Sequence, residues 1–143
     1  MTAVSFGNHA AVRVSRGNRE QLRSFYLDVL GGQLIRALPN KDDVKLGNDF
    51  YIAFLYSGGD GRPVGQGVAY AADDALGQDE FLRAMFLELK ADDVDSARRR
   101  IVESGVKILN VPDSHLYFQA PGGQVFRLVG THEDLSEYEG TSL

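Results

Sequence analysis

Few side chains in this 143-residue sequence are suited to chemistry at a reactive centre. There are three histidines, His9, His115 and His132, and no cysteine. Disulfides, thiolate zinc sites and a cysteine nucleophile are therefore excluded, and His, Asp and Glu remain as metal ligands. For His9 we favour a polar side chain at a strand end near solvent. The alternatives are a residual metal ligand, a hydrogen-bond donor to a bound molecule, or a general base if a substrate reaches it. His115 follows Ser114, but neighbouring strand residues point to opposite faces, so this pair is unsuited to nucleophilic catalysis.

Arg127 is the second residue with a marked chemical character. It lies in an apolar segment, 124–129, that is typical of a strand. A planar guanidinium can pair bidentately with a carboxylate or phosphonate, and a buried one needs an anion nearby. Two interpretations stay open. Arg127 either pairs internally with Glu88, which we favour, or anchors a ligand.

Hydrophobic periodicity predicts the elements that position these residues. Alternation predicts a strand at 9–15, and apolar residues at three- and four-residue steps predict a helix over 19–30 that ends at Gly31 and Gly32. Short strands follow at 33–38, 44–46 and 50–56. The second half repeats the order, with a strand at 84–90, a helix from about 92 to 104, and strands at 106–109, 115–119 and 124–129.

The sequences of the two halves align at an offset of about 74 residues, which indicates a duplicated unit. We therefore expect an α+β fold of tandem βαβββ modules that form a cup-shaped, half-barrel mixed sheet with helices outside. The expected boundaries are 1–56 for the first module, 57–80 for a linker or flap, 81–130 for the second module and 131–143 for an acidic C-terminal tail. The glycines at 58, 59 and 61 lack the sequence of a phosphate-binding loop.

Alternation also assigns side chains to the face of each sheet that has no helix, which we call the cup face. Ala11, Ala53, Leu55 and Lys90 are expected there. The candidate ligand-binding residues on the cup faces are His9, Arg13, Tyr51, Phe86, Glu88, Tyr117 and Arg127. For the aromatic members, ordinary sheet packing is an equally simple explanation.

The hairpin around Ala120-Pro121-Gly122-Gly123, together with the segments 25–31 and 86–94, resembles the vicinal oxygen chelate superfamily, which includes glyoxalases, bleomycin resistance proteins and extradiol dioxygenases. The resemblance extends from His9 to Val129. It implies metal ligands on the first and last strands of each module. Those positions hold His9, Ala53, Phe86 and Arg127, so one ligand type of four is retained. The resemblance also implies a homodimer, in which one cup can combine modules from two chains.

Composition excludes several classes of function. The net charge of −5 disfavours a nucleic-acid partner. No apolar run approaches the roughly 20 residues of a membrane span, and no export signal precedes the first strand. We therefore expect a soluble, cytoplasmic protein with no membrane partner.

The preferred functional hypothesis is a protein like the bleomycin resistance proteins that binds a small anionic or aromatic molecule without a complete metal site and without a cofactor. The alternative is a metal-dependent lyase, isomerase or dioxygenase with a divalent ion at a rearranged site, using His9 with Glu88 and with His115 or glutamates of the flap as further ligands. A third hypothesis is that side chains fill the cup and the protein serves as an accessory that binds another protein. Catalytic residues stay unassigned, with His9 as the candidate.

Overall fold

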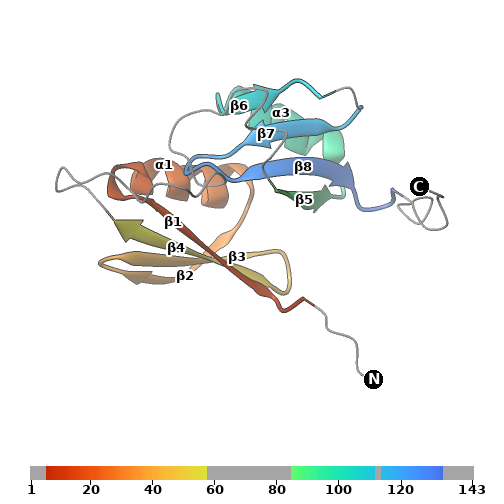
Figure 1. Ribbon diagram of the computed structural model, residues 1–143. Helices are drawn as coiled ribbons and strands as arrows, with labels where there is room; N and C mark the ends of the chain where they lie inside the picture. The colour runs from red at the N-terminus through yellow and green to blue at the C-terminus, as the bar shows by residue number, and fades with distance from the viewer. Residues whose placement is uncertain (1–5, 58–84, 112–113, 134–143) are drawn as a thin grey trace.

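The computed structural model describes residues 6–57, 85–111 and 114–133, and it contains two βαβββ modules (Figure 1). The expected α+β fold of tandem modules is confirmed. The first module consists of β1 (His9–Ser15), η1 (Arg16–Asn18), α1 (Arg19–Arg23), η2 (Ser24–Val29), β2 (Gln33–Leu38), β3 (Lys41–Leu46) and β4 (Phe50–Ser57). The second consists of β5 (Phe86–Ala91), α3 (Val94–Glu103), β6 (Lys107–Leu109), β7 (Leu116–Gln119) and β8 (Val125–Gly130).

Both modules build a four-stranded mixed sheet with the same strand order. Sheet 1 has the order β1-β4-β3-β2, and sheet 2 has the order β5-β8-β7-β6. The first and last strands of each module pair in parallel, with His9 opposite Tyr51 and Phe86 opposite Val125. Tyr51 and Val125 are 74 positions apart, so the strand register confirms the duplication predicted from the sequence.

The first helix ends in a widened turn. Its second half, η2, is a π-helix, and the Leu30 amide donates to the Phe25 carbonyl at 2.9 Å. The Gly32 amide then donates to the Tyr26 carbonyl at 2.8 Å. A Cβ atom on Gly32 would lie 2.8 Å from that carbonyl oxygen, so only glycine allows the chain to turn this closely into β2. The predicted helix is thus present, but its final turns are wider than an α-helix.

The helix-covered faces of the two sheets share one hydrophobic core. The ring of Tyr26 lies 4.6 Å from that of Phe54 in sheet 1 and 6.2 Å from that of Phe126 in sheet 2. Figure 1 shows α1 between the two sheets. Each helix is therefore outside its own half-barrel, as expected, while the two cup faces are directed away from each other. One chain does not close a cup shared by its two modules.

Candidate functional site

The cup face of sheet 2 brings together four of the predicted site residues. Arg127 on β8 lies opposite Glu88 on β5 and Tyr117 on β7. Its Nε and Nη2 donate to Glu88 Oε2 at 3.0 and 2.5 Å, and its Nη1 donates to the Tyr117 hydroxyl at 3.2 Å. The internal pair of Arg127 and Glu88 is therefore formed. We call Phe86, Glu88, Tyr117 and Arg127 the guanidinium cluster.

Two aromatic rings enclose the guanidinium of Arg127. Its Cζ atom lies 5.2 Å from the centre of the Phe86 ring and 5.9 Å from that of Tyr117. The two rings meet edge to face with centres 5.5 Å apart. Phe86 is 40% exposed, whereas Tyr117 is buried against Leu109 and Val125. The cluster therefore presents one accessible ring beside a cation that is held in place.

The electrostatics of the cluster favour a charged arginine whose charge is balanced. Burial acts to lower the pKa of Arg127, but hydrogen bonds to Glu88 and Tyr117 outweigh it, and the net pKa is raised above its usual value. The guanidinium thus stays protonated. Its nearest counter-charge comes from the protein itself, which weakens its attraction for a ligand anion.

The other three predicted site residues lie on the cup face of sheet 1. His9 and Tyr51 are neighbours across β1 and β4, and Arg13 lies at the far end of β1 beside Leu55. His9 and Arg13 are exposed and Tyr51 is half-buried. The Nζ atom of Lys45 lies 5.7 Å from the centre of the Tyr51 ring. Within one chain these residues are separated from the guanidinium cluster by the shared core.

The residues at the strand positions that hold metal ligands in related proteins do not fit a metal ion. Only His9 can donate to a cation, because Ala53 and Phe86 have no donor atom and Arg127 carries a positive charge. Glu88 is engaged by Arg127. Across residues 6–57, 85–111 and 114–133, no three His, Asp or Glu side chains gather in a way that could hold a metal. The rearranged site of His9 with Glu88 is not assembled within one chain.

Two hollows in the described part of the chain include residues of the cup-face strands in their lining. One of about 640 Å³ is bordered by Phe25 and Val106 together with Lys107 and Gln119, and one of about 400 Å³ by Phe50 and Leu89 together with Glu88 and Lys90. Both border the helices, where the modules meet. A closed cavity on a cup face would need a second surface placed over that face.

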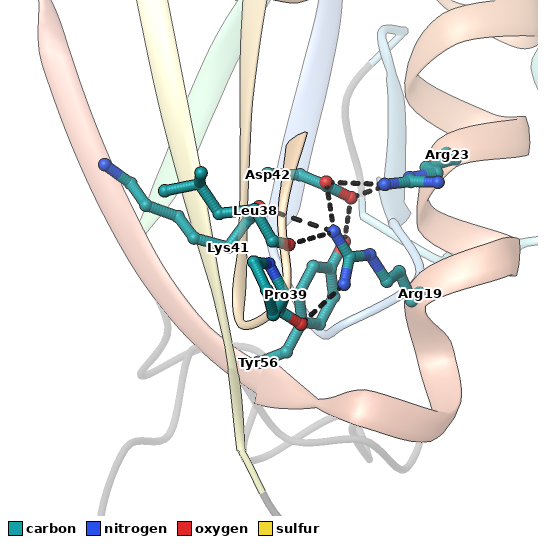
Figure 2. Close-up of polar contacts among 7 residues, drawn as sticks. All are labelled: Arg19, Arg23, Leu38, Pro39, Lys41, Asp42 and Tyr56. Atoms are coloured by element: carbon teal, nitrogen blue, oxygen red, sulfur yellow. Dashed lines mark hydrogen bonds and ion pairs between the residues drawn. The ribbon is translucent and has the colours of Figure 1, made fainter. Parts of the chain in front are cut away.

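A buried ionic cluster that the sequence did not reveal fixes α1 to sheet 1 (Figure 2). Asp42 on β3 is 0% exposed and accepts hydrogen bonds from Arg19, Arg23 and Tyr56 at 2.7 to 2.8 Å. Arg19 also donates to the carbonyl oxygens of Leu38 and Pro39. Burial acts to raise the pKa of Asp42, but the three partners outweigh it and lower the pKa to about 2. The cluster lies on the helix-covered face, so its role is structural.

His115 also lies outside the guanidinium cluster. It precedes β7 and pairs with Glu133 through Nε2 and Oε1. That bond is the main cause that lowers the pKa of Glu133. His132, in the C-terminal tail, is exposed.

Comparison with known protein families assigns the chain to a superfamily. The model of the glyoxalase/bleomycin resistance protein/dioxygenase superfamily matches residues 8–122. The chain belongs to this superfamily. The match begins just before His9, includes Phe86, Glu88 and Tyr117, and ends before Arg127. The superfamily resemblance seen in the sequence is confirmed.

Several solved structures share the fold at low sequence identity. TnmS3, an antibiotic binding protein from Streptomyces sp. CB03234, is 24% identical with a TM-score of 0.56, over 91% of this chain and 98% of that one. An integron cassette protein of V. cholerae is 18% identical with a TM-score of 0.61, over 92% and 98%. The fosfomycin resistance protein FosX from Listeria monocytogenes, complexed with Mn(II) and sulfate, is 14% identical with a TM-score of 0.62, over 94% and 95%.

Two further findings concern the relatives of this chain and its helices. No curated protein sequence matches it. In the described part of the chain, no helix has both the length and the apolar character needed to cross a membrane.

Proposed function

We propose that this superfamily member binds a small aromatic molecule on the guanidinium cluster without a complete metal site. The observation that supports this most directly is the geometry around Arg127, whose guanidinium is held by Glu88 and flanked by two rings. An exposed Phe86 beside a fixed guanidinium offers a stacking surface of the kind that binds flat π-systems. The similarity to TnmS3, an antibiotic binding protein, is consistent with a binding role.

The proposed binding unit is a homodimer. Each chain directs two cup faces outward, and each face is half of an enclosed site. Placing sheet 1 of one chain over sheet 2 of a second chain would close two equivalent cups by a single twofold operation. Phe86 and Arg127 of one copy would then face Tyr51 and His9 of the other.

The neutral dye N-phenyl-1-naphthylamine tests the aromatic site, because its fluorescence rises in an apolar environment. We expect Phe86→Ala to weaken its binding roughly tenfold, the loss of one stacking partner and its buried area. Val102→Ala is the matched control, since Val102 is 47% exposed on α3 and lies on no cup face. Absence of dye binding to the wild type, or equal affinities for wild type and Phe86→Ala, would refute the proposal.

Mixing two variants that each bind the dye weakly tests whether the cup is shared between chains. If Tyr51→Ala and Phe86→Ala each weaken binding, a mixed dimer contains one cup with both defects and one with none. Refolding the two variants together should then restore wild-type affinity at a reduced number of sites. A site formed within one chain would regain nothing on mixing.

A further inference from the structure

The cup faces of the two sheets have the opposite charge balance to the chain as a whole. The chain carries 20 acidic and 15 basic residues. Strand register places seven of the basic residues on the cup faces, with only two acidic residues, Asp43 and Glu88. The basic residues on these faces are Arg13, Arg36, Lys41, Lys45, Lys90, Lys107 and Arg127. An acidic protein thus concentrates positive charge on the two surfaces that have no helix.

Four of these seven basic residues lie on the cup face of sheet 1, where they surround short side chains. Three rows cross its cup face. The outer rows hold Lys45 with Tyr51 and His9, and Lys41 with Leu55 and Arg13. The middle row holds Asp43, Ala53 and Ala11, and Arg36 of β2 lies opposite Asp43. Because the two alanines are short, the longer cationic side chains of the outer rows extend beyond them.

Internal pairing leaves much of this charge unbalanced. Lys41 Nζ lies 3.1 Å from Asp43 Oδ1, the one carboxylate on the described strands of this face. Arg13 is exposed, and within the described residues no hydrogen bond or ion pair is recorded for its guanidinium. Lys45 contacts the Tyr51 ring, which leaves its charge in place.

The described strands of a second copy would not neutralise this face. On the described strands of sheet 2, Glu88 is the one carboxylate of the cup face, and it is bonded to Arg127. Lys90 and Lys107 add positive charge to that same face. Joining the two sheets across a dimer therefore concentrates positive charge in an enclosed space of low dielectric, where an anion gains most.

We propose that the ligand carries an anionic group, and that Arg13, Lys41, Lys45 and Arg36 of sheet 1 bind it. This inference rests on the proposed function, since the aromatic part of the same molecule would lie on the guanidinium cluster of sheet 2. The two sheets then recognise different parts of one ligand. The chemistry that fits is an aromatic compound bearing a carboxylate, sulfonate or phosphate group.

Two dyes that share one ring system separate the anionic from the aromatic contribution. 8-Anilinonaphthalene-1-sulfonate differs from N-phenyl-1-naphthylamine by its sulfonate. We expect the double variant Arg13→Gln, Lys45→Gln to bind the sulfonate dye roughly tenfold more weakly and to lose part of the salt dependence of binding. Its affinity for the neutral dye should change less than about twofold. The control Arg99→Gln, Arg100→Gln removes two charges from the exposed side of α3 and should leave both affinities unchanged.

Inorganic phosphate supplies a test that does not depend on the aromatic site. At equal ionic strength, phosphate should raise the melting temperature of the wild type and of the α3 control relative to chloride, and should not do so for the double variant. If neither dye binds but phosphate stabilises in this pattern, the proposed function fails and the anion site stands. Equal loss of both dyes in the double variant, or a phosphate effect that is absent or the same in all three proteins, would overturn the anion site.

Discussion

Replacing Asp42 by asparagine should cost a large part of the stability of this protein. The carboxylate is fully buried and accepts hydrogen bonds from two arginines and the Tyr56 hydroxyl. Its pKa of about 2, compared with 3.8 in a free side chain, corresponds to about 2 kcal/mol of stability at neutral pH. Breaking a buried ion pair typically costs about 3–5 kcal/mol. Because the side chains of Arg19 and Arg23 keep 20% and 31% exposure to water, we expect a loss of about 2–4 kcal/mol.

Urea unfolding followed by far-UV circular dichroism measures this loss at one fixed protein concentration, since dimerisation would shift the midpoint. Asp43→Asn is the matched control. Asp43 is the next residue of β3, points to the cup face and contacts Lys41 at 3.1 Å. The side chains of Lys41 and Asp43 are 31% and 14% exposed, so this pair is still partly solvated, and we expect its loss to cost about 1 kcal/mol. If Asp42→Asn lost no more stability than Asp43→Asn, the ionic cluster would not be what holds α1 to sheet 1.

The same cluster predicts a pH dependence with a defined sign. The folded-state pKa of Asp42 is depressed, so the unfolded chain binds a proton first as the pH falls. The contribution of Asp42 is complete above pH about 4 and is lost as the pH falls towards about 2. The wild type should therefore lose more stability than Asp42→Asn between pH 4 and pH 2. Parallel stability curves for the two proteins in this range would contradict the assigned pKa.

Two core substitutions give further expected outcomes. Tyr26→Phe should leave the free energy of unfolding unchanged or raise it by up to about 1 kcal/mol, because the Tyr26 hydroxyl is buried with no hydrogen-bond partner recorded in the described part of the chain; a loss above that value in urea unfolding would reveal a partner. Gly122→Ala should lose about 1–3 kcal/mol, because φ is +89° and the new Cβ would lie 2.9 Å from Val14 Cγ1. Gly130→Ala, which meets nothing within 4 Å, is its control.

Periodicity predicted which side chains share a face, because a sheet has a strict period of two. Val14 and Phe54 alternate with residues that were expected on the cup face, and both are buried on the helix-covered face. Phe86, Glu88 and Arg127 were expected on the opposite face and lie together on it. The duplication helped as well, since the parallel register of β1 with β4 recurs in β5 with β8.

The charged start of β3 could not be predicted from local pattern. The sequence Lys41-Asp42-Asp43 is typical of a turn, and the strand was predicted from 44 instead of Lys41. Asp42 is tolerated at a buried strand position because its partners come from α1, 23 and 19 residues away. With the strand shortened, Lys41 and Asp43 could not be assigned to a face, and the basic character of the sheet 1 cup face was missed.

The arrangement of the two modules also depends on contacts that no single segment encodes. Apolar alternation shows that each sheet has a covered and an uncovered face, but not which faces meet. Here Tyr26 of the first module packs on Phe126 of the second, and the shared core extends from Val14 to Leu128. The side chains of the helix-covered faces are therefore needed for the stability of the fold.

The cup faces are under a weaker constraint. Phe86 and Leu55 remain 40% and 37% exposed there, and Arg13 is exposed as well. Substitutions at such positions change stability little. The cup faces can therefore differ in their chemistry while the fold of the superfamily is retained.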